Sequence, residues 1–238
     1  MILLSWQQDP ERPLIVAANR DEFFERPTLA AHFWPAAPHI LAGRDQQYGG
    51  SWLGLSRNGR FAAITNLRNA TAGDRSRGEL VRNFLDTDRS CAEFFSALEA
   101  DKQQYRPFNF IACDGRELAH SQNTCAGWQT LAPGQHIVGN IPFGTLSQKI
   151  HKGLSDFKAL PAERADHQQL LAMMQDDQPA EVSDDALQQA LSCRFVRSPT
   201  YGTRSSSVVF LHRHGGAELW EQSYDSKQRQ GALQHFQL

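Results

Sequence analysis

Two apolar stretches open the chain, at residues 2–6 and 13–18, and the polar sequence Gln8-Asp9-Pro10-Glu11 separates them. Short apolar runs on either side of such a turn predict a β-hairpin. The second run contains no polar position after Pro13, a pattern typical of a strand covered on both faces. It breaks at Asn19-Arg20-Asp21-Glu22, where we expect the strand to end.

Further strands are expected along the chain. Residues 49–55 and 61–65 flank Asn58-Gly59, and Asn-Gly between apolar runs is the strongest short-range hairpin signal. By contrast, the Pro- and Ala-rich residues 27–38 are predicted to form a loop. The remaining predicted strands are residues 108–113, 118–120, 135–138, 205–212 and 217–222, the last two as an antiparallel pair.

Helical periodicity appears in two places between these strands. One helix is predicted from near Ser76 and a second from Ser90, each with its apolar residues at helical spacing. Residues 145–191 are also helical in character. The order is strands, helices, strands, helices, strands, without a repeating βαβ unit. It predicts antiparallel sheets with helices outside them, in one domain over residues 1–238.

Composition narrows the class of protein. The 238 residues are 40% hydrophobic and 21% charged, and the mean hydropathy of -0.51 is that of an ordinary globular chain. A formal net charge of -2 gives no electrostatic reason to expect nucleic acid or an anionic membrane as a partner. No apolar run is long enough for a membrane span, and residues 1–6 are too short for a signal sequence. We therefore expect a cytoplasmic protein without membrane insertion.

Neither the cysteines nor the histidines form a metal-binding pattern. The four cysteines are widely spaced, without a C-x-x-C pair, which argues against structural zinc and against a disulfide scaffold. They are expected to be free thiols, buried or partly buried. His212-Arg213-His214 precedes Gly215-Gly216, and two histidines without a third ligand indicate a solvated hairpin end. Dinucleotide and phosphate-loop patterns are absent from the sequence, so no cofactor is predicted.

Polar residues at strand ends are the candidate site. Arg20 and Asp21 follow the second apolar run, Asn66 follows the strand at 61–65, and Asn140 follows residues 137–139. Arg204 lies just before the apolar residues 208–211. Asn amides can donate to a developing oxyanion, and Arg can orient a carboxylate or substrate oxygen. Taken one at a time, each is also explained as a capping or turn residue.

The motifs that contain these residues resemble the NRDE family, which includes the transport and Golgi organisation protein 2 proteins. The resemblance spans nearly the whole chain and is weakest over residues 148–198. The matching sequences are Asn19-Arg20-Asp21-Glu22 with Arg26-Pro27, Leu41-Ala42-Gly43-Arg44-Asp45, Gly50-Ser51-Trp52-Leu53-Gly54, Ala63-Ile64-Thr65-Asn66, Ser76-Arg77-Gly78-Glu79-Leu80, Gly139-Asn140 and Tyr201-Gly202-Thr203-Arg204-Ser205-Ser206.

The resemblance implies a fold and a set of roles. The family is similar in its motifs to N-terminal nucleophile hydrolases of the penicillin acylase and bile-salt hydrolase type, which cut linear amides. It implies an α+β fold, a four-layer αββα sandwich with two mostly antiparallel sheets between helices. By this resemblance Arg20 and Asp21 would flank the nucleophile. Asn66 and Asn140 would serve the oxyanion and the α-amino group, and Arg204 would hold the site in place. We expect these five residues to converge.

The chain departs from the family pattern at its first residues. Family members typically begin Met-Cys, and removal of Met exposes a cysteine whose own α-amino group is the base. Here Ile2 follows Met1, and a residue as large as Ile should prevent removal of Met1. Two functions are therefore kept open.

The first function is an amide hydrolase for a small-molecule amide, with a nucleophile that this chain as numbered does not contain. The second is a non-catalytic protein on the same fold that binds another small ligand. Since the resemblance includes relatives linked to the secretory pathway and to haem trafficking, it implies such ligands or pathways for the second function.

Overall fold

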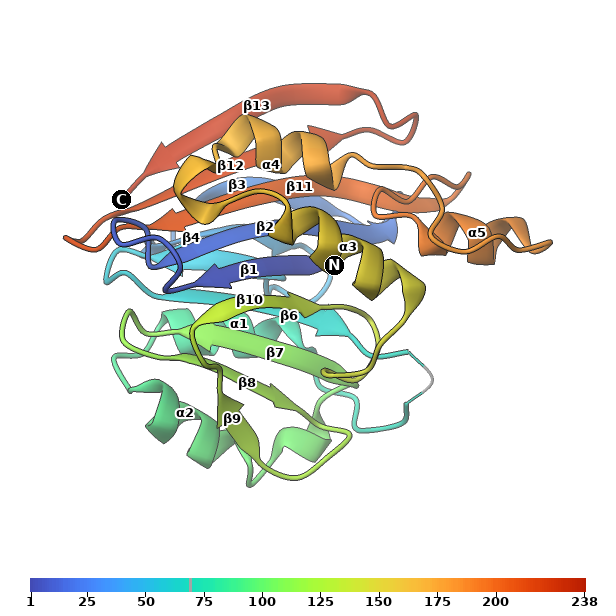
Figure 1. The fold of residues 1–238 in the computed structure, drawn as a ribbon. Helices are drawn as coiled ribbons and strands as arrows, with labels where there is room; N and C mark the ends of the chain where they lie inside the picture. The colour runs from blue at the N-terminus through green and yellow to red at the C-terminus, as the bar shows by residue number, and fades with distance from the viewer. Residues whose placement is uncertain (69) are drawn as a thin grey trace. The chain divides into compact units, whose positions relative to one another are not determined.

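The alternating apolar runs form two antiparallel sheets, one in each of two units of the chain (Figure 1). The computed structural model describes residues 1–68 and 70–238. Unit 1 comprises residues 1–26, 133–137 and 146–237, and unit 2 comprises residues 27–132 and 138–145 together with Leu238. The prediction of one domain over residues 1–238 stays a prediction beside this division.

Unit 1 contains a six-stranded sheet in the order β10-β1-β2-β11-β12-β13. The N-terminus lies at the start of β1, which is an inner strand (Figure 1). The first hairpin is antiparallel, with Ile2 opposite Ala18 and Trp6 opposite Leu14. The strands are β1 (Ile2–Trp6), β2 (Leu14–Phe23), β10 (Gly134–Val138), β11 (Tyr201–Leu211), β12 (Ala217–Tyr224) and β13 (Gln230–Gln237).

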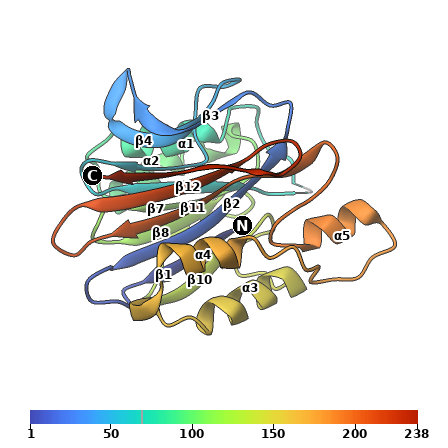
Figure 2. The ribbon, with the colours of Figure 1, turned by 90° about the horizontal axis from the view of Figure 1, so that it is seen from above.

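The helices of unit 1 are short. Helix α3 packs against β1, and α4 packs against β2 and β11 (Figures 1 and 2). Gly153 permits the close approach of α3 because a Cβ there would lie 3.3 Å from Met1 Sδ and 2.9 Å from Ile137 Cδ1. The helices are α3 (Gln148–Lys158), α4 (His167–Met174) and α5 (Ala186–Ser192), with a 3-10 turn at Ala162–Arg164.

Unit 2 contains a seven-stranded sheet in the order β3-β4-β5-β6-β7-β8-β9. Its strands follow one another along the chain and each pairs with the next. Between β6 and β7 the chain forms α1 and α2 before it returns to the sheet. The strands are β3 (Thr28–Trp34), β4 (Ala37–Asp45), β5 (Leu53–Ser56), β6 (Phe61–Asn66), β7 (Phe108–Cys113), β8 (Leu118–Gln122) and β9 (Trp128–Thr130).

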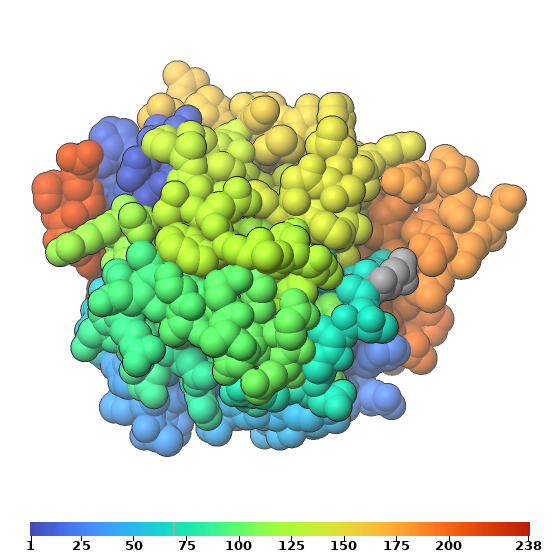
Figure 3. Space-filling view, turned by 90° about the horizontal axis from the view of Figure 1, so that it is seen from below, coloured from blue at the N-terminus to red at the C-terminus, as the bar shows by residue number. Residues whose placement is uncertain are grey.

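Helices α1 (Gly78–Leu85) and α2 (Cys91–Leu98) cover the seven-stranded sheet. The apolar residues that gave these helices their periodicity lie in one core cluster with Phe108 and Phe110 of β7. The rings of Phe84 and Phe95 lie edge-on and tilted against Phe110, at centroid distances of 6.2 and 5.3 Å. The outer side of α2 forms part of the face seen in Figure 3, where it is green.

Ser90 begins α2, as predicted, and the structure shows that it forms a capping box with Glu93. Its hydroxyl accepts from Glu93 N at 3.2 Å, and Glu93 Oε2 accepts from Ser90 N at 2.8 Å. We expect Ser90→Ala to lower the free energy of unfolding by about 1 kcal/mol, because one N-terminal N–H loses its acceptor. Urea unfolding measures this. Ser96→Ala, an exposed change within the same helix, should stay within about 0.5 kcal/mol of the parent; an equal loss in both variants would contradict the prediction.

Most predicted elements are present, and two predictions were wrong. The strand that was expected to stop at Asn19 continues to Phe23, because β11 pairs with it through Asp21 and beyond. The expected loop at residues 27–38 is instead β3 and the start of β4. Pro35 lies in the turn between them, and pairing with β4 keeps the alanines of β3 extended.

Two edge strands of the structure, β13 and β9, were not predicted from the sequence. The predicted pair at residues 205–212 and 217–222 is present as β11 and β12, but it is followed by β13, which the sequence did not reveal. Residues of β13 are mostly exposed, so no apolar alternation marks them. The three-residue strand β9 is an edge strand too and was missed for the same reason.

The cysteines are free thiols. Three are buried as expected, but the expectation was wrong for Cys125, which is exposed in the turn between β8 and β9. Burial raises the pKa of Cys113 to about 12 and raises that of Cys91 further. Among the residues described, no helix is long and apolar enough to cross a membrane.

Candidate functional site

Asn19 fixes the polar half of β2 to the rest of unit 1. Its side chain is buried, and its Nδ2 donates to Met174 O at 2.7 Å and to Arg194 O at 2.9 Å. Its Oδ1 accepts from Ser206 Oγ at 2.6 Å. These three hydrogen bonds all connect the Asn19 side chain to the interior of unit 1. Asn19 is therefore a structural residue that determines where Arg20 and Asp21 lie.

Asp21 is held from β11. Its Oδ1 accepts from Thr203 Oγ1 at 2.7 Å, and the same hydroxyl oxygen accepts from Val196 N at 2.9 Å. The Tyr201 hydroxyl donates to Asp21 O at 3.2 Å. The side chain remains partly exposed, so the carboxylate is oriented while still able to contact a ligand. Arg20, one residue earlier, is partly buried and lies opposite Ser205.

Arg204 occupies an irregularity in β11, where the pairing with β2 shifts between Thr203 and Ser205. Its Nη1 donates to the carbonyls of Phe23, Phe24 and Arg26, at 2.9, 3.1 and 3.2 Å. Burial lowers the pKa of Arg204, and Glu22 partly offsets this. These contacts secure the turn that follows Asp21. The role of Arg204 in holding a catalytic site stays a prediction.

Asn66 and Asn140 form the second group, in unit 2. Asn66 ends β6, and Asn140 lies in the loop after β10. Asn140 Nδ2 donates to Asn66 O at 2.9 Å, and Asn140 O accepts from Arg68 N at 3.1 Å. Two residues 74 positions apart in the sequence are thus in contact.

The five predicted residues therefore fall into two groups. Arg20, Asp21 and Arg204 come together on the paired strands β2 and β11, and Asn66 and Asn140 contact one another. Convergence of the two groups stays a prediction.

Sequence reasoning missed two residues that bear on these groups. Thr203 orients Asp21, and Asn109 of β7 contacts the loop that carries Asn140. A lone Asn within the apolar sequence Phe108-Asn109-Phe110-Ile111 was a signal that could have been followed. A buried amide must be hydrogen-bonded, so such a residue indicates a partner segment.

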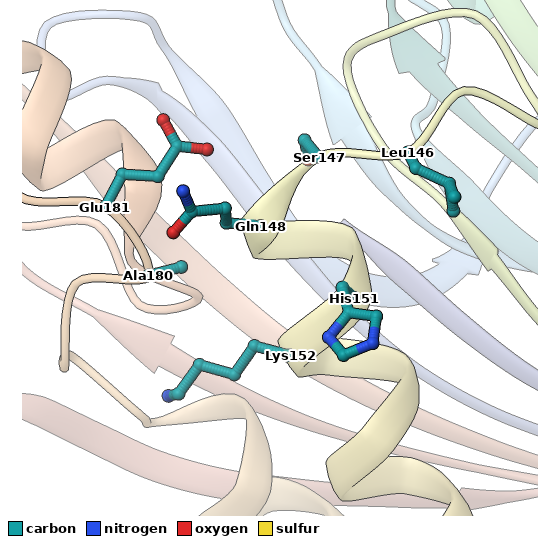
Figure 4. Close-up of a pocket in the computed structure, with 7 residues that line it drawn as sticks. All are labelled: Leu146, Ser147, Gln148, His151, Lys152, Ala180 and Glu181. Carbon is teal, nitrogen blue, oxygen red and sulfur yellow. The ribbon is translucent and has the colours of Figure 1, made fainter.

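A hollow of 680 Å³ lies at the N-terminal end of α3 in unit 1 (Figure 4). Figure 4 shows the Gln148 side chain directed toward Glu181, while His151 and Lys152 extend to different sides of the helix. Lys152 forms an ion pair with Asp176. The lining is Leu146, Ser147, Gln148, His151, Lys152, Ala180 and Glu181. Because the side chains that line the hollow carry charges of both signs, the hollow favours no single class of ligand.

No group of three or more His, Cys, Asp or Glu residues that could hold a metal occurs in the described ranges.

Comparison with solved structures defines the class of the fold. The chain is similar to penicillin V acylase from Agrobacterium tumefaciens, with a TM-score of 0.57 at 10% identity, covering 99% of this chain and 90% of that one. A conjugated bile acid hydrolase from Clostridium perfringens gives a TM-score of 0.61 at 9% identity, with 99% and 91% covered. The chain has the N-terminal nucleophile hydrolase fold. This confirms the predicted α+β class with two mostly antiparallel sheets.

The family follows from the sequence comparison. The model of the Transport and Golgi organisation 2 family matches residues 1–226, and the chain belongs to this family. The Transport and Golgi organization protein 2 homolog of Bos taurus is 34% identical over 245 residues, covering 88% of this chain and 86% of the relative. That of Homo sapiens is 31% identical over 246 residues, covering 90% and 87%. The resemblance found in the motifs is confirmed.

Proposed function

We propose that this protein provides the scaffold of an amide hydrolase for a linear amide of a small molecule. Its hydrolytic step requires a thiol or hydroxyl on a residue directly upstream of Met1. The observation that carries the proposal is the register of the first hairpin. Met1 N donates to Asn19 O at 3.2 Å, and Asn19 N donates to Met1 O at 2.9 Å.

This pairing defines what lies opposite a residue added before Met1. The strands are antiparallel, with Ile2 opposite Ala18 and Met1 opposite Asn19. A residue added before Met1 on β1 therefore lies opposite Arg20. Asp21 is the next residue along β2. An N-terminal nucleophile at this position is thus flanked by the two residues to which the family resemblance gives that role.

Hydrolysis of an amide by an N-terminal thiol needs few chemical groups from the protein. The free α-amino group, with a pKa of about 7.7–8, takes the proton from the thiol, and the sulfur attacks the amide carbonyl carbon. The C–N bond breaks as the departing amine takes the proton, and water then cleaves the thioester to the acid and the thiol. The family resemblance gives the amide groups of Asn66 and Asn140 the role of donors to the negative oxygen that forms on attack.

Two versions of the protein test the proposal. One starts at Met1, and the other has a cysteine as its free N-terminal residue directly before Met1. Each is treated with iodoacetamide, the adducts are mapped by mass spectrometry, and a panel of linear amides is screened for hydrolysis. We expect an N-terminal adduct and turnover only in the second version, because Met1 supplies an amine without a nucleophilic side chain.

The internal cysteines provide the reference for labelling. Exposed Cys125 should react in both versions, whereas buried Cys91 and Cys113 should react slowly because burial raises their pKa. A version with alanine as the added residue is the matched control. Turnover by the Met1 chain or by the alanine version would refute the mechanism.

A non-catalytic binding protein is the second candidate. It is favoured by Met1 itself, whose side chain is buried and packs against α3 as a core residue does. An added N-terminal cysteine that neither reacts nor supports turnover would leave this second function as the better one.

A further inference from the structure

Asn109 is a fully buried amide on the face of β7 opposite to the aromatic core. Its neighbours Phe108 and Phe110 belong to the core cluster beneath the helices, so strand alternation turns Asn109 to the other face. It lies opposite Thr65 of β6 on one side and Gln122 of β8 on the other.

The amide of Asn109 contacts the loop that carries Asn140 on both sides of that residue. Asn109 Nδ2 donates to Gly139 O at 3.1 Å and to Ile141 O at 2.9 Å. The Thr65 hydroxyl donates to the same Gly139 carbonyl at 2.5 Å. The two peptide carbonyls that flank Asn140 are therefore fixed to the sheet, which determines the direction in which the Asn140 side chain leaves the backbone.

Neighbouring side chains orient the amide and secure the rest of the loop. His120 Nε2 lies 3.3 Å from Asn109 Oδ1, and the His120 ring lies against the Phe143 ring, tilted by 30° with centroids 4.3 Å apart. Gln122 Oε1 accepts from Phe143 N at 2.9 Å. Alternate loop residues are thus bound by three adjacent strands, and a network satisfied in this way is rigid.

We propose that Asn109 is a positioning residue: it fixes the backbone of residues 139–141 so that the Asn140 side chain lies against the end of β6. The consequence for catalysis rests on the proposed function, in which Asn140 is an amide donor. The positioning itself does not, and it can be measured without a substrate.

Asn123 offers a matched control in the same unit. It is also a buried Asn, and its Nδ2 likewise donates to carbonyls, at Tyr105 (2.9 Å) and Lys102 (3.3 Å), while its Oδ1 accepts from Phe108 N at 2.9 Å. Removing either amide costs stability, but only the Asn109 amide contacts residues 139–141.

The experiment is native hydrogen exchange of Asn109→Ala and Asn123→Ala in the Met1 chain, read by mass spectrometry. We expect peptides covering residues 139–145 to exchange about tenfold faster in Asn109→Ala, since losing about 1.4 kcal/mol of local stability has this effect. In Asn123→Ala the faster exchange should be confined to residues 102–108, because Phe108 N also loses its acceptor. Thr65→Val, a milder change, should accelerate residues 139–145 less and in the same direction.

Equal exchange of residues 139–145 in the two alanine variants, with Thr65→Val unchanged, would overturn the proposal and leave Asn109 a residue of general stability. If Asn109→Ala does not fold, the Thr65→Val result decides alone. Faster loop exchange in Asn109→Ala beside a cysteine-led version that cleaves no amide would reject the hydrolase function and keep the positioning role.

Discussion

Asn19→Ala should lower the free energy of unfolding by about 3 kcal/mol, because three buried polar groups lose their hydrogen bond to its side chain. These are the carbonyls of Met174 and Arg194 and the hydroxyl of Ser206, all within hydrogen-bond distance of the Asn19 side chain. Urea unfolding at pH 7.5, followed by far-UV circular dichroism, measures the loss.

A second variant separates the loss of hydrogen bonds from the loss of packing. Asn19→Asp keeps the shape and the acceptor for Ser206 but places a carboxylate oxygen against two carbonyls. It should therefore be at least as destabilising as alanine. Asn58→Ala removes an exposed amide that bonds Asp88, and should change stability by no more than about 0.5 kcal/mol. An Asn19→Asp protein as stable as the parent would contradict the assigned donor role.

The dependence on Asn19 also explains why the end of β2 was misjudged from sequence. A strand that meets Asn, Arg and Asp in succession loses its apolar pattern, so periodicity predicts an end. The partners that allow it to continue come from α4 and β11, more than 150 residues away, and no local pattern contains them. The same holds for β13, whose exposed edge position leaves no hydrophobic signature.

Elements with local determinants were predicted well. The Asn58-Gly59 turn and the helix start at Ser90 each depend on residues within a few positions, and both are present. The candidate site was different. Asn66 and Asn140 were selected as candidates because both matched family motifs, whereas periodicity alone described each of them as a residue at the end of a strand. The structure shows a hydrogen bond between them.

What supports the two Asn residues could not be predicted in the same way. Asn109 lies in an apolar strand, and its partners Gly139 and Ile141 are 30 and 32 residues away. Their meeting depends on how β7 pairs with β6 and on how the chain returns after β10. Side-chain hydrogen bonds of this kind follow from the assembled sheet, so the sequence gives only the type of residue and not its partners.

His120 makes the stability of this network depend on pH. Burial alone lowers the pKa of His120 to about 3, from an ordinary value of 6.5, so the folded protein holds a neutral imidazole beside Asn109. Its folded pKa lies below its unfolded pKa. The unfolded chain therefore binds the proton first as pH falls, and stability present above pH 6.5 is lost between pH 6.5 and 3. At pH 4.5 the loss should be about 3 kcal/mol.

The variant His120→Gln keeps a hydrogen-bond donor for Asn109 but does not titrate. The measurement is the difference in unfolding free energy between the parent and this variant from pH 7.5 to 4.5, in which contributions of unrelated carboxylates cancel. We expect the difference to shift steadily in favour of the variant as the pH falls, with the His120 ring protons in NMR spectra keeping their neutral-form shifts. A constant difference over this range would show that His120 takes up its proton equally in the folded and unfolded states, and that water reaches the network beside Asn140.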